Sequence, residues 1–157
     1  MRHAKSAWDN PDLPDHDRPL NDRGRHAAPV MGRWLATQGL VPDQVLTSSA
    51  RRTLDTLAGL GLGPTPTQVL PQLYHAEPDT ILTALRDHAT GTCVLVLGHN
   101  PGLSLFAGRF VTNPMDHPRL HDLPTGGTLV VDLTVAWGAV DWGTGHAHSF
   151  AAPRDFW

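Results

Sequence analysis

The sequence predicts a single α/β domain in which helices cover both faces of a mostly parallel central sheet. Its 157 residues are the usual size of one domain. Short apolar runs alternate along the chain with segments of helical periodicity, and the run from Thr92 to Leu97 is continuously apolar, as in a strand buried on both faces. Because strands that alternate with helices favour parallel pairing, we expect one three-layer α/β/α sandwich over residues 1–157.

The first predicted helix runs from about residue 21 to residue 38. Asn21 is a suitable N-cap for it, and Gly39 is a suitable stop. Pro29 falls inside this segment and is expected to kink the helix or delay its start, because proline lacks the N–H of the helical hydrogen bond. A short strand is expected next, at 44–47.

The remaining elements continue the alternation of strands and helices. In order, we expect a helix to about residue 60, a strand at 67–70, a helix at 78–88, a strand at 92–97, a helix at 101–111, and strands at 128–135 and 147–151. Residues 113–127, with three of the 14 prolines, are expected to form an irregular loop. The last two strands are expected to form a C-terminal hairpin, which adds an antiparallel edge.

Composition limits the classes of function. The net charge of −3 argues against a general nucleic-acid binder, but residues 1–52 hold eight Lys or Arg against six Asp, which favours a local anion site there. The only cysteine, Cys93, excludes an intramolecular disulfide and abuts an apolar run, which favours a buried hydrophobe over a nucleophile. We expect a cytoplasmic protein with no membrane partner, because the chain shows neither a signal peptide nor a membrane-spanning apolar stretch.

Polar residues follow the apolar strand at the point where it ends. His99 and Asn100 lie directly after the strand at 92–97 and before the helix at 101–111. Ligands of α/β sheets bind beyond the carboxyl ends of strands, where the first N–H groups of the next helix lack partners and attract anions. This segment therefore predicts an anion site. The alternative is that His99 and Asn100 only cap the helix.

The segment at 48–56 repeats this arrangement of strand, turn and helix. Arg52 falls in the first helical turn, where a guanidinium can donate two hydrogen bonds to a phosphate. For this segment alone, an exposed ion pair between Arg52 and Asp55 is the alternative. Arg2 and His3 are expected at the same edge of the sheet. Two imidazoles and two guanidiniums gathered at one edge favour a phosphoryl-transfer site.

Five motifs occur in order over most of the chain. They are Arg-His-Ala-Lys-Ser at 2–6, Asp-Arg-Pro-Leu-Asn-x-Arg-Gly at 17–24, Ser-x3-Arg-x3-Thr at 48–56, Leu-Tyr-His-Ala at 73–76 and Gly-His-Asn at 98–100. This ordered set resembles the histidine phosphatase superfamily, the phosphoglycerate-mutase-like group. Within the superfamily, the chain is most similar to the small branch of SixA-type phosphohistidine phosphatases.

The resemblance implies a role for each residue that matches a motif. His3 is expected to be the nucleophile that becomes transiently phosphorylated. Arg2 and Arg52 are expected to hold the phosphoryl oxygens, and His99 is expected to complete the phosphate pocket with Asn100. The resemblance implies no metal and no cofactor, because cationic side chains stabilise the transferring group in their place.

Other residues are candidates for substrate contacts or for proton transfer. Arg18 and Ser6 are candidate substrate-site residues, although pairing of Arg18 with a neighbouring aspartate is the alternative. Glu77, the only glutamate, is the candidate general acid, with Asp79 as the second choice. An exposed carboxylate at a helix start is the alternative for Glu77. A phosphohistidine substrate would not need the acid, because a protonated imidazole is a good leaving group.

The start of the chain departs from the family pattern. In the superfamily, the Arg-His pair ends a central first strand, whereas here only Met1 precedes it. We therefore expect the first strand to be missing and the domain at 1–157 to be N-terminally truncated relative to the family. Each buried group left unpaired on a neighbouring strand would cost about 1 kcal/mol or more. The hypothesis is a chain that carries the catalytic set but folds poorly and has low activity.

The expected function is that of a metal-independent phosphatase. It would hydrolyse phosphohistidine or a small phosphomonoester through a phospho-His3 intermediate, so its partner is a phosphorylated protein or small molecule and not a nucleic acid. The alternative is a catalytically silent phosphate-binding or regulatory domain of the same fold. A mutase would need a second phosphate site, and the chain is too short for the insertions that would supply one.

Overall fold

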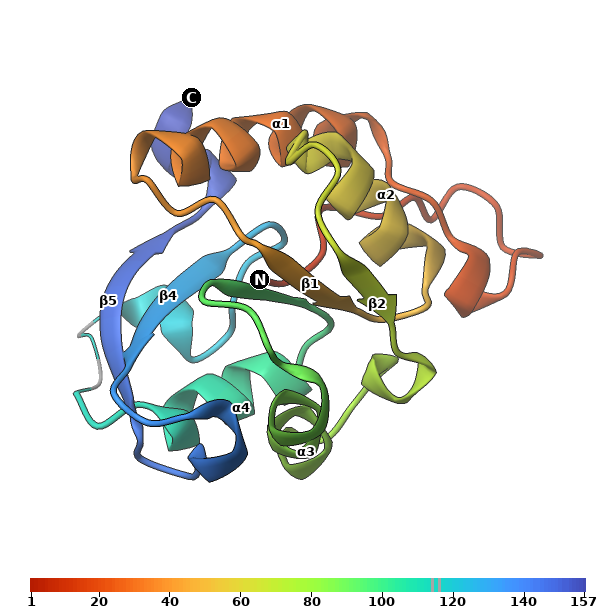
Figure 1. Ribbon diagram of the computed structural model, residues 1–157. Helices are drawn as coiled ribbons and strands as arrows, with labels where there is room; N and C mark the ends of the chain where they lie inside the picture. The colour runs from red at the N-terminus through yellow and green to blue at the C-terminus, as the bar shows by residue number, and fades with distance from the viewer. Residues whose placement is uncertain (114, 116) are drawn as a thin grey trace.

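The computed structural model describes residues 1–113, 115 and 117–157, and its elements alternate as expected (Figure 1). The strands are β1 (Gln44–Thr47), β2 (Thr67–Val69), β3 (Val94–Leu97), β4 (Thr128–Leu133) and β5 (Gly145–Ala151). The α-helices are α1 (Asp22–Thr37), α2 (Arg51–Leu60), α3 (Pro78–His88) and α4 (Gly102–Phe110). The strands β2, β1 and β3 pair in that order as a parallel sheet, and β4 pairs antiparallel with β5.

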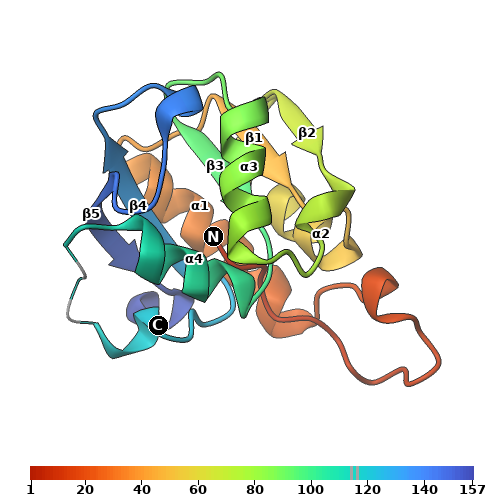
Figure 2. The same ribbon diagram turned by 90° about the horizontal axis from the view of Figure 1, so that it is seen from below.

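Helices cover both faces of the parallel sheet (Figures 1 and 2). α1 packs beside α2 on one face, and α3 packs beside α4 on the other. The side chains of β1 alternate between these layers: Val45 packs in one cluster with Met31 of α1, whereas Leu46 packs in a second cluster with Leu85 of α3. The predicted three-layer α/β/α sandwich, with a mostly parallel sheet and a C-terminal hairpin, is confirmed.

The first three residues connect the parallel sheet to the hairpin. The N–H of Gly98 donates to the Met1 carbonyl at 3.2 Å, and the N–H of His3 donates to the Gly98 carbonyl at 3.1 Å. On the other side, the N–H of Arg2 donates to the Gly127 carbonyl at 3.0 Å. The start of the chain therefore takes the place of a central strand between β3 and β4, over a length of three residues (Figure 1).

A cavity of about 370 Å³ continues the same gap between β3 and β4. Its lining is mostly apolar and comes from both strands and from the helices that face them. Among the lining residues are Met1, Val94, Val96, Phe106, Leu129 and Val131. The cavity thus lies beside the short segment of residues 1–3 that pairs with Gly98 and Gly127.

An apolar segment of about five residues, the usual length of a strand, added in front of Met1 is expected to stabilise the protein. It would pair with β3 and β4 and fill the cavity, and we expect Tm to rise by about 5 °C or more. A Gly-Ser segment of equal length is the matched control, because it adds chain without side chains that fill space. Equal melting temperatures for the two extended proteins and the parent would contradict the prediction.

The proline inside α1 does not delay the start of the helix. α1 begins at Asp22, because Asn21 Oδ1 accepts a hydrogen bond from the N–H of Gly24 at 3.0 Å and caps the helix well before Pro29. Of the two effects expected of Pro29, a kink or a delayed start, the delayed start is wrong. After the last turn, Gly39 has a φ of +69°, which lets the chain leave the helix as expected.

The expected irregular loop at 113–127 contains one 3₁₀ turn at Pro118–Leu120. Residues 114 and 116 of that loop lie outside the described residues. Within the described part of the chain, no helix has both the length and the apolar character needed to cross a bilayer.

Candidate active site

Three buried polar side chains meet beyond the carboxyl ends of β1 and β3. His99 follows β3, Arg52 lies in the first turn of α2 after β1, and His3 follows the short segment between β3 and β4. The exposed fractions of His3, Arg52 and His99 are only 7%, 4% and 3%. Because burial of such groups is costly without partners or a ligand, their contacts indicate what the site binds.

The imidazole of His3 is held in one tautomer. Its Nδ1 lies 2.7 Å from the Ala4 carbonyl oxygen, which can only accept, so Nδ1 carries the hydrogen and Nε2 carries the lone pair. The Nε–H of Arg52 donates to this Nε2 at 3.2 Å. Burial, together with the charges of Arg52 and Arg2, lowers the pKa of His3 to about 4. His3 is therefore a neutral imidazole whose lone pair points to a guanidinium.

The second imidazole faces the first. The ring centroid of His99 lies 5.1 Å from that of His3, and its Nε2 lies 2.8 Å from Ser48 Oγ. Ser48 Oγ already accepts from the N–H of Ala50, so its own hydrogen is free to be donated to His99 Nε2. Burial, followed by the charges of its neighbours, lowers the pKa of His99 to about 2 and keeps the ring neutral. With Ser48 Oγ as the donor to Nε2, the one hydrogen of the neutral ring lies on Nδ1.

Two buried nitrogens at this edge have no hydrogen-bond partner in the described part of the chain. They are Nδ1 of His99 and Nε of Arg2. Arg2 is otherwise held by the Leu123 carbonyl and by an ion pair with Asp122 at 3.7 Å. Since buried polar nitrogens are nearly always satisfied, these two unpartnered ones, beside the second guanidinium at this edge, that of Arg52, favour an oxyanion ligand.

Arg52 is held on its other edge by Asp15. Its NH1 donates to the Asp15 carbonyl at 2.7 Å, and its NH2 donates to Asp15 Oδ2 at 3.0 Å. The alternative pairing of Arg52 with Asp55 does not occur, because Asp55 instead pairs with the exposed Arg51 at 2.9 Å on the outer face of α2.

Sequence reasoning missed the cluster around Asp15. Asp15 Oδ2 accepts hydrogen bonds from Tyr74 OH at 2.6 Å and from His75 Nε2 at 3.0 Å, besides that from Arg52. Burial raises the pKa of Asp15, but these hydrogen bonds outweigh it and hold the pKa well below its usual range. The Leu-Tyr-His-Ala motif was the available signal, although nothing in the sequence assigns its side chains a partner.

Two predicted site residues lie at the margin of this arrangement. Glu77 is exposed at the N-cap position of α3 and makes no side-chain capping bond. The amide of Asn100 donates to Asp122 and Leu123 at 2.8 and 3.0 Å, so its side chain holds the loop that also contacts Arg2. A proton-donor role for Glu77 and phosphate binding by Asn100 stay predictions.

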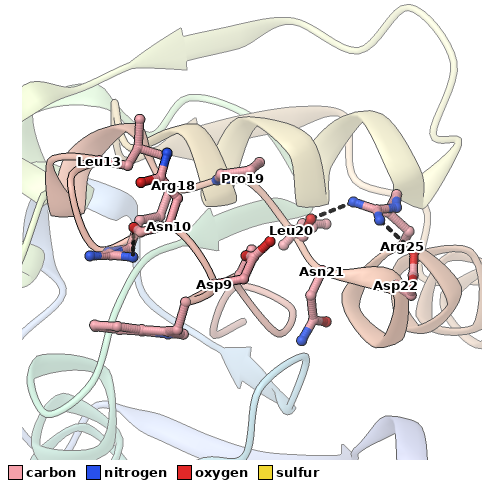
Figure 3. A pocket seen from close by; sticks show the side chains of 11 residues that line it. Asp9, Asn10, Leu13, Arg18, Pro19, Leu20, Asn21, Asp22 and Arg25 are labelled. Carbon is pink, nitrogen blue, oxygen red and sulfur yellow. Dashed lines mark hydrogen bonds and ion pairs between the residues drawn. The ribbon is translucent and has the colours of Figure 1, made fainter.

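Arg18 lines an open pocket of about 520 Å³ in front of α1, and Ser6 contacts Trp8, which also lines it (Figure 3). The guanidinium of Arg18 stacks 4.3 Å from the Trp8 ring centroid, and its NH1 donates to the Asn10 carbonyl at 3.1 Å. Arg18 Nε lies 4.0 Å from Asp15 Oδ1, which connects this pocket to the site. Ser6 Oγ accepts from Trp8 Nε1 at 3.1 Å, so Ser6 supports the side chain that lines the pocket.

The side chains at this edge of the sheet are of the kinds that bind and transfer a phosphoryl group. Two neutral imidazoles and two guanidiniums gather at this edge of the sheet, and one imidazole presents a lone pair, an arrangement suited to phosphoryl transfer. No group of three or more His, Cys, Asp or Glu suited to a metal ion occurs among the described residues.

A family model described as histidine phosphatase superfamily (branch 1) matches residues 1–77. The chain belongs to the histidine phosphatase superfamily.

Relatives and solved structures extend the match over the whole chain. The chain is 36% identical to the uncharacterized protein Rv1276c of Mycobacterium tuberculosis, over 98% of this chain and 100% of the relative. Its structure is similar to that of a Nakamurella multipartitia protein named as a candidate phosphohistidine phosphatase SixA, with a TM-score of 0.86, 27% identity and coverage of 98% and 93% of the two chains. The fold is also that of the protein histidine phosphatase SixA complexed with tungstate, with a TM-score of 0.82, 24% identity and coverage of 100% and 97%.

The two imidazoles are expected to make stability depend on pH. The pKa values of about 4 for His3 and about 2 for His99 lie below the ordinary 6.5, so the unfolded state binds more protons as pH falls below 6.5. The free energy of unfolding should therefore fall between pH 6.5 and 4. His3 alone should contribute a loss of about 3 kcal/mol, at about 1.4 kcal/mol per pKa unit.

Urea unfolding of the parent and of His3→Asn across this pH window tests the prediction. The variant lacks the titrating group, so its stability should change less with pH than that of the parent. Identical pH dependence in the two proteins would show that His3 does not titrate as its burial requires.

Proposed function

We propose that the protein is a metal-independent phosphatase that acts on phosphohistidine or small phosphomonoesters through a phospho-His3 intermediate. The observation that carries this proposal is the fixed tautomer of His3. Nδ1–H donates to Ala4, so the lone pair lies on Nε2, beside the guanidinium of Arg52. The lowered pKa of this buried ring, about 4, keeps it neutral and nucleophilic at neutral pH.

Phosphate binding would use the donors that lack a protein partner. Phosphoryl oxygens can accept from Arg2 Nε and His99 Nδ1, both of which are buried and unpartnered in the described chain. A third oxygen would take the Nε–H of Arg52 away from His3 Nε2 and so free the lone pair. Two guanidiniums and one imidazole N–H then stabilise the charge of the transferring group.

The proposed reaction has two displacements at phosphorus. In the first, a bond forms between His3 Nε2 and phosphorus while the bond from phosphorus to the leaving atom breaks, and His3 keeps its Nδ1 hydrogen on the Ala4 carbonyl. In the second, water attacks phosphorus and the Nε2–P bond breaks. His3 leaves as the neutral ring, and the water hydrogens leave with inorganic phosphate or pass to solvent.

The surroundings of the leaving group favour phosphohistidine within this proposal. An ester oxygen needs a proton donor as it leaves, whereas an imidazole protonated on its other nitrogen leaves as a neutral ring. Glu77, the predicted donor, is exposed at the start of α3. The similarity to structures named for SixA supports the same substrate class.

A catalytically silent phosphate-binding domain is the second candidate. It is favoured by the hydrogen bond from Arg52 Nε to His3 Nε2, which occupies the lone pair that attack requires. A domain of this kind would bind inorganic phosphate at the same donors and form no covalent intermediate.

Turnover of para-nitrophenyl phosphate and of a phosphohistidine peptide, each with and without EDTA, tests the proposal. We expect hydrolysis of both at rates that EDTA does not change, with the higher kcat/KM for the phosphohistidine peptide. Activity lost in EDTA and restored by a divalent cation would contradict metal independence. Phosphate binding without turnover of either substrate would favour the second candidate.

A further inference from the structure

The two oxygens of the Asp15 carboxylate have different surroundings. Oδ2 accepts three hydrogen bonds, at 2.6 Å from Tyr74 OH, 3.0 Å from His75 Nε2 and 3.0 Å from Arg52 NH2. Oδ1 accepts none from the described residues, and the nitrogen of Arg18 paired with it lies 4.0 Å away. With 38% of the side chain exposed, the carboxylate is locked through one oxygen and leaves the other as a free acceptor.

The Asp15 carboxylate, which carries this free acceptor, is linked to the nucleophile through one side chain. The guanidinium of Arg52 lies between the carboxylate and the nucleophile. Its NH2 donates to Asp15 Oδ2 at 3.0 Å, and its Nε donates to His3 Nε2 at 3.2 Å. In a displacement at phosphorus, the leaving atom lies opposite the attacking nitrogen. With His3 and His99 buried, the leaving group departs toward the exposed side of the site, where the Asp15 cluster lies.

The same side of the site offers a surface for a flat ring. The ring centroids of Tyr74 and His75 lie 5.4 and 5.0 Å from that of His99, and half of the His75 side chain is exposed. Aromatic pairs pack at such separations. A leaving imidazole can therefore stack on these rings with an N–H directed at the carboxylate.

We propose that Asp15 determines the substrate class: its free oxygen accepts a hydrogen bond from the N–H of a protonated leaving imidazole and so favours phosphohistidine over phosphomonoesters. This inference rests on the proposed function. As the P–N bond breaks, its electron pair returns to the ring nitrogen and cancels the positive charge of the ring. The leaving group departs as neutral imidazole, with its other nitrogen still donating to Asp15.

An ester would gain nothing from this carboxylate. Its leaving oxygen has no hydrogen to donate and develops negative charge, which a nearby carboxylate repels. The hydrogen bonds from Tyr74, His75 and Arg52 hold the pKa of Asp15 well below its usual range, so the group is an acceptor and not a proton donor. The ionised carboxylate thus assists the departure of an imidazole but not that of an ester oxygen, although it holds Arg52 in place for both substrate classes.

The test compares kcat/KM for phosphoimidazole and for para-nitrophenyl phosphate in Asp15→Asn. We expect kcat/KM for phosphoimidazole to fall about 30-fold or more, as for loss of a hydrogen bond to a charged group, and kcat/KM for the aryl phosphate to fall much less. The control is Asp17→Asn, since Asp17 is an exposed neighbour whose carboxylate contacts His16. The control should leave both values unchanged. Asp15→Ser provides a second charge-free variant if Asp15→Asn unfolds.

Two outcomes would overturn the assignment of Asp15. An equal loss on both substrates would mean that Asp15 only positions Arg52, and no loss on either would mean that it has no part in the reaction. In both cases an active parent protein leaves the proposed function standing. A parent protein inactive on both substrates would overturn the proposed function together with this inference.

Discussion

Replacement of His3 by alanine is expected to lower kcat by about 10³-fold or more, to near the background rate. The substitution removes the ring nitrogen assigned as the nucleophile, Nε2 of His3, whose lone pair faces the Nε–H of Arg52 until a phosphoryl oxygen takes that donor. The remaining donors would still bind phosphate. We therefore expect the affinity for inorganic phosphate, measured by calorimetry, to change far less than kcat.

Loss of a buried ring could also unfold the protein, so folding must be measured separately. His3→Gln retains more of the side-chain volume, and its amide can still donate toward the Ala4 carbonyl that His3 contacts at 2.7 Å. A variant that has the parent's circular dichroism and melts near the parent's Tm, but shows no turnover, would separate catalysis from folding. A folded His3 variant with more than about a tenth of the parent kcat would contradict the assigned role.

Replacement of Arg52 by alanine is expected to lower kcat/KM by about 10²–10³-fold, the usual effect of removing one group that stabilises transition-state charge. Arg52 donates hydrogen bonds to both His3 and Asp15, so its loss also removes two of the hydrogen bonds that hold Asp15. Arg52→Lys should be more active than Arg52→Ala, because lysine restores the positive charge, but less active than the parent, because its ammonium lacks the planar set of N–H donors.

The adjacent arginine supplies a matched control. Arg51 lies in the same helical turn, is exposed, and pairs with Asp55 at 2.9 Å, away from the site. Arg51→Ala should change kcat/KM by less than about twofold, since exposed ion pairs contribute little. Steady-state kinetics of both variants, with Tm as the check on folding, measure the contrast. Equal losses in the two variants would contradict the assignment of Arg52.

Local signals predict most of the fold. The strand at 94–97 is a continuous apolar run, the strand at 44–47 centres on Val45 and Leu46, and the first helix begins directly after Asn21, whose side chain caps it. Because parallel strands end at one edge, the positions of Arg52 and His99 after two such strands predict that they meet. These inferences need only the hydrophobic periodicity of the sequence, its helix-capping residues and the general topology of α/β sheets.

Long-range pairings set the limit of what the sequence predicts. Asp15 contacts Tyr74 and His75 from a loop far away in the chain, and His75 adopts a φ of +48° that no local pattern signals. The side chain of Asn100 bonds to the 122–123 loop, a choice that depends on where that loop packs. Such contacts follow from the three-dimensional path of loops, which hydrophobic periodicity does not encode.

Trapping the phosphorylated protein tests the central claim most directly. The protein is mixed briefly with radiolabelled phosphoimidazole and quenched in alkali, in which phosphohistidine survives, and the labelled peptide is identified by mass spectrometry. We predict one phosphoryl group on His3, formed and lost at least as fast as kcat, and absent from His3→Ala. Turnover with no label on His3, or with the label on another residue, would contradict a mechanism through phospho-His3.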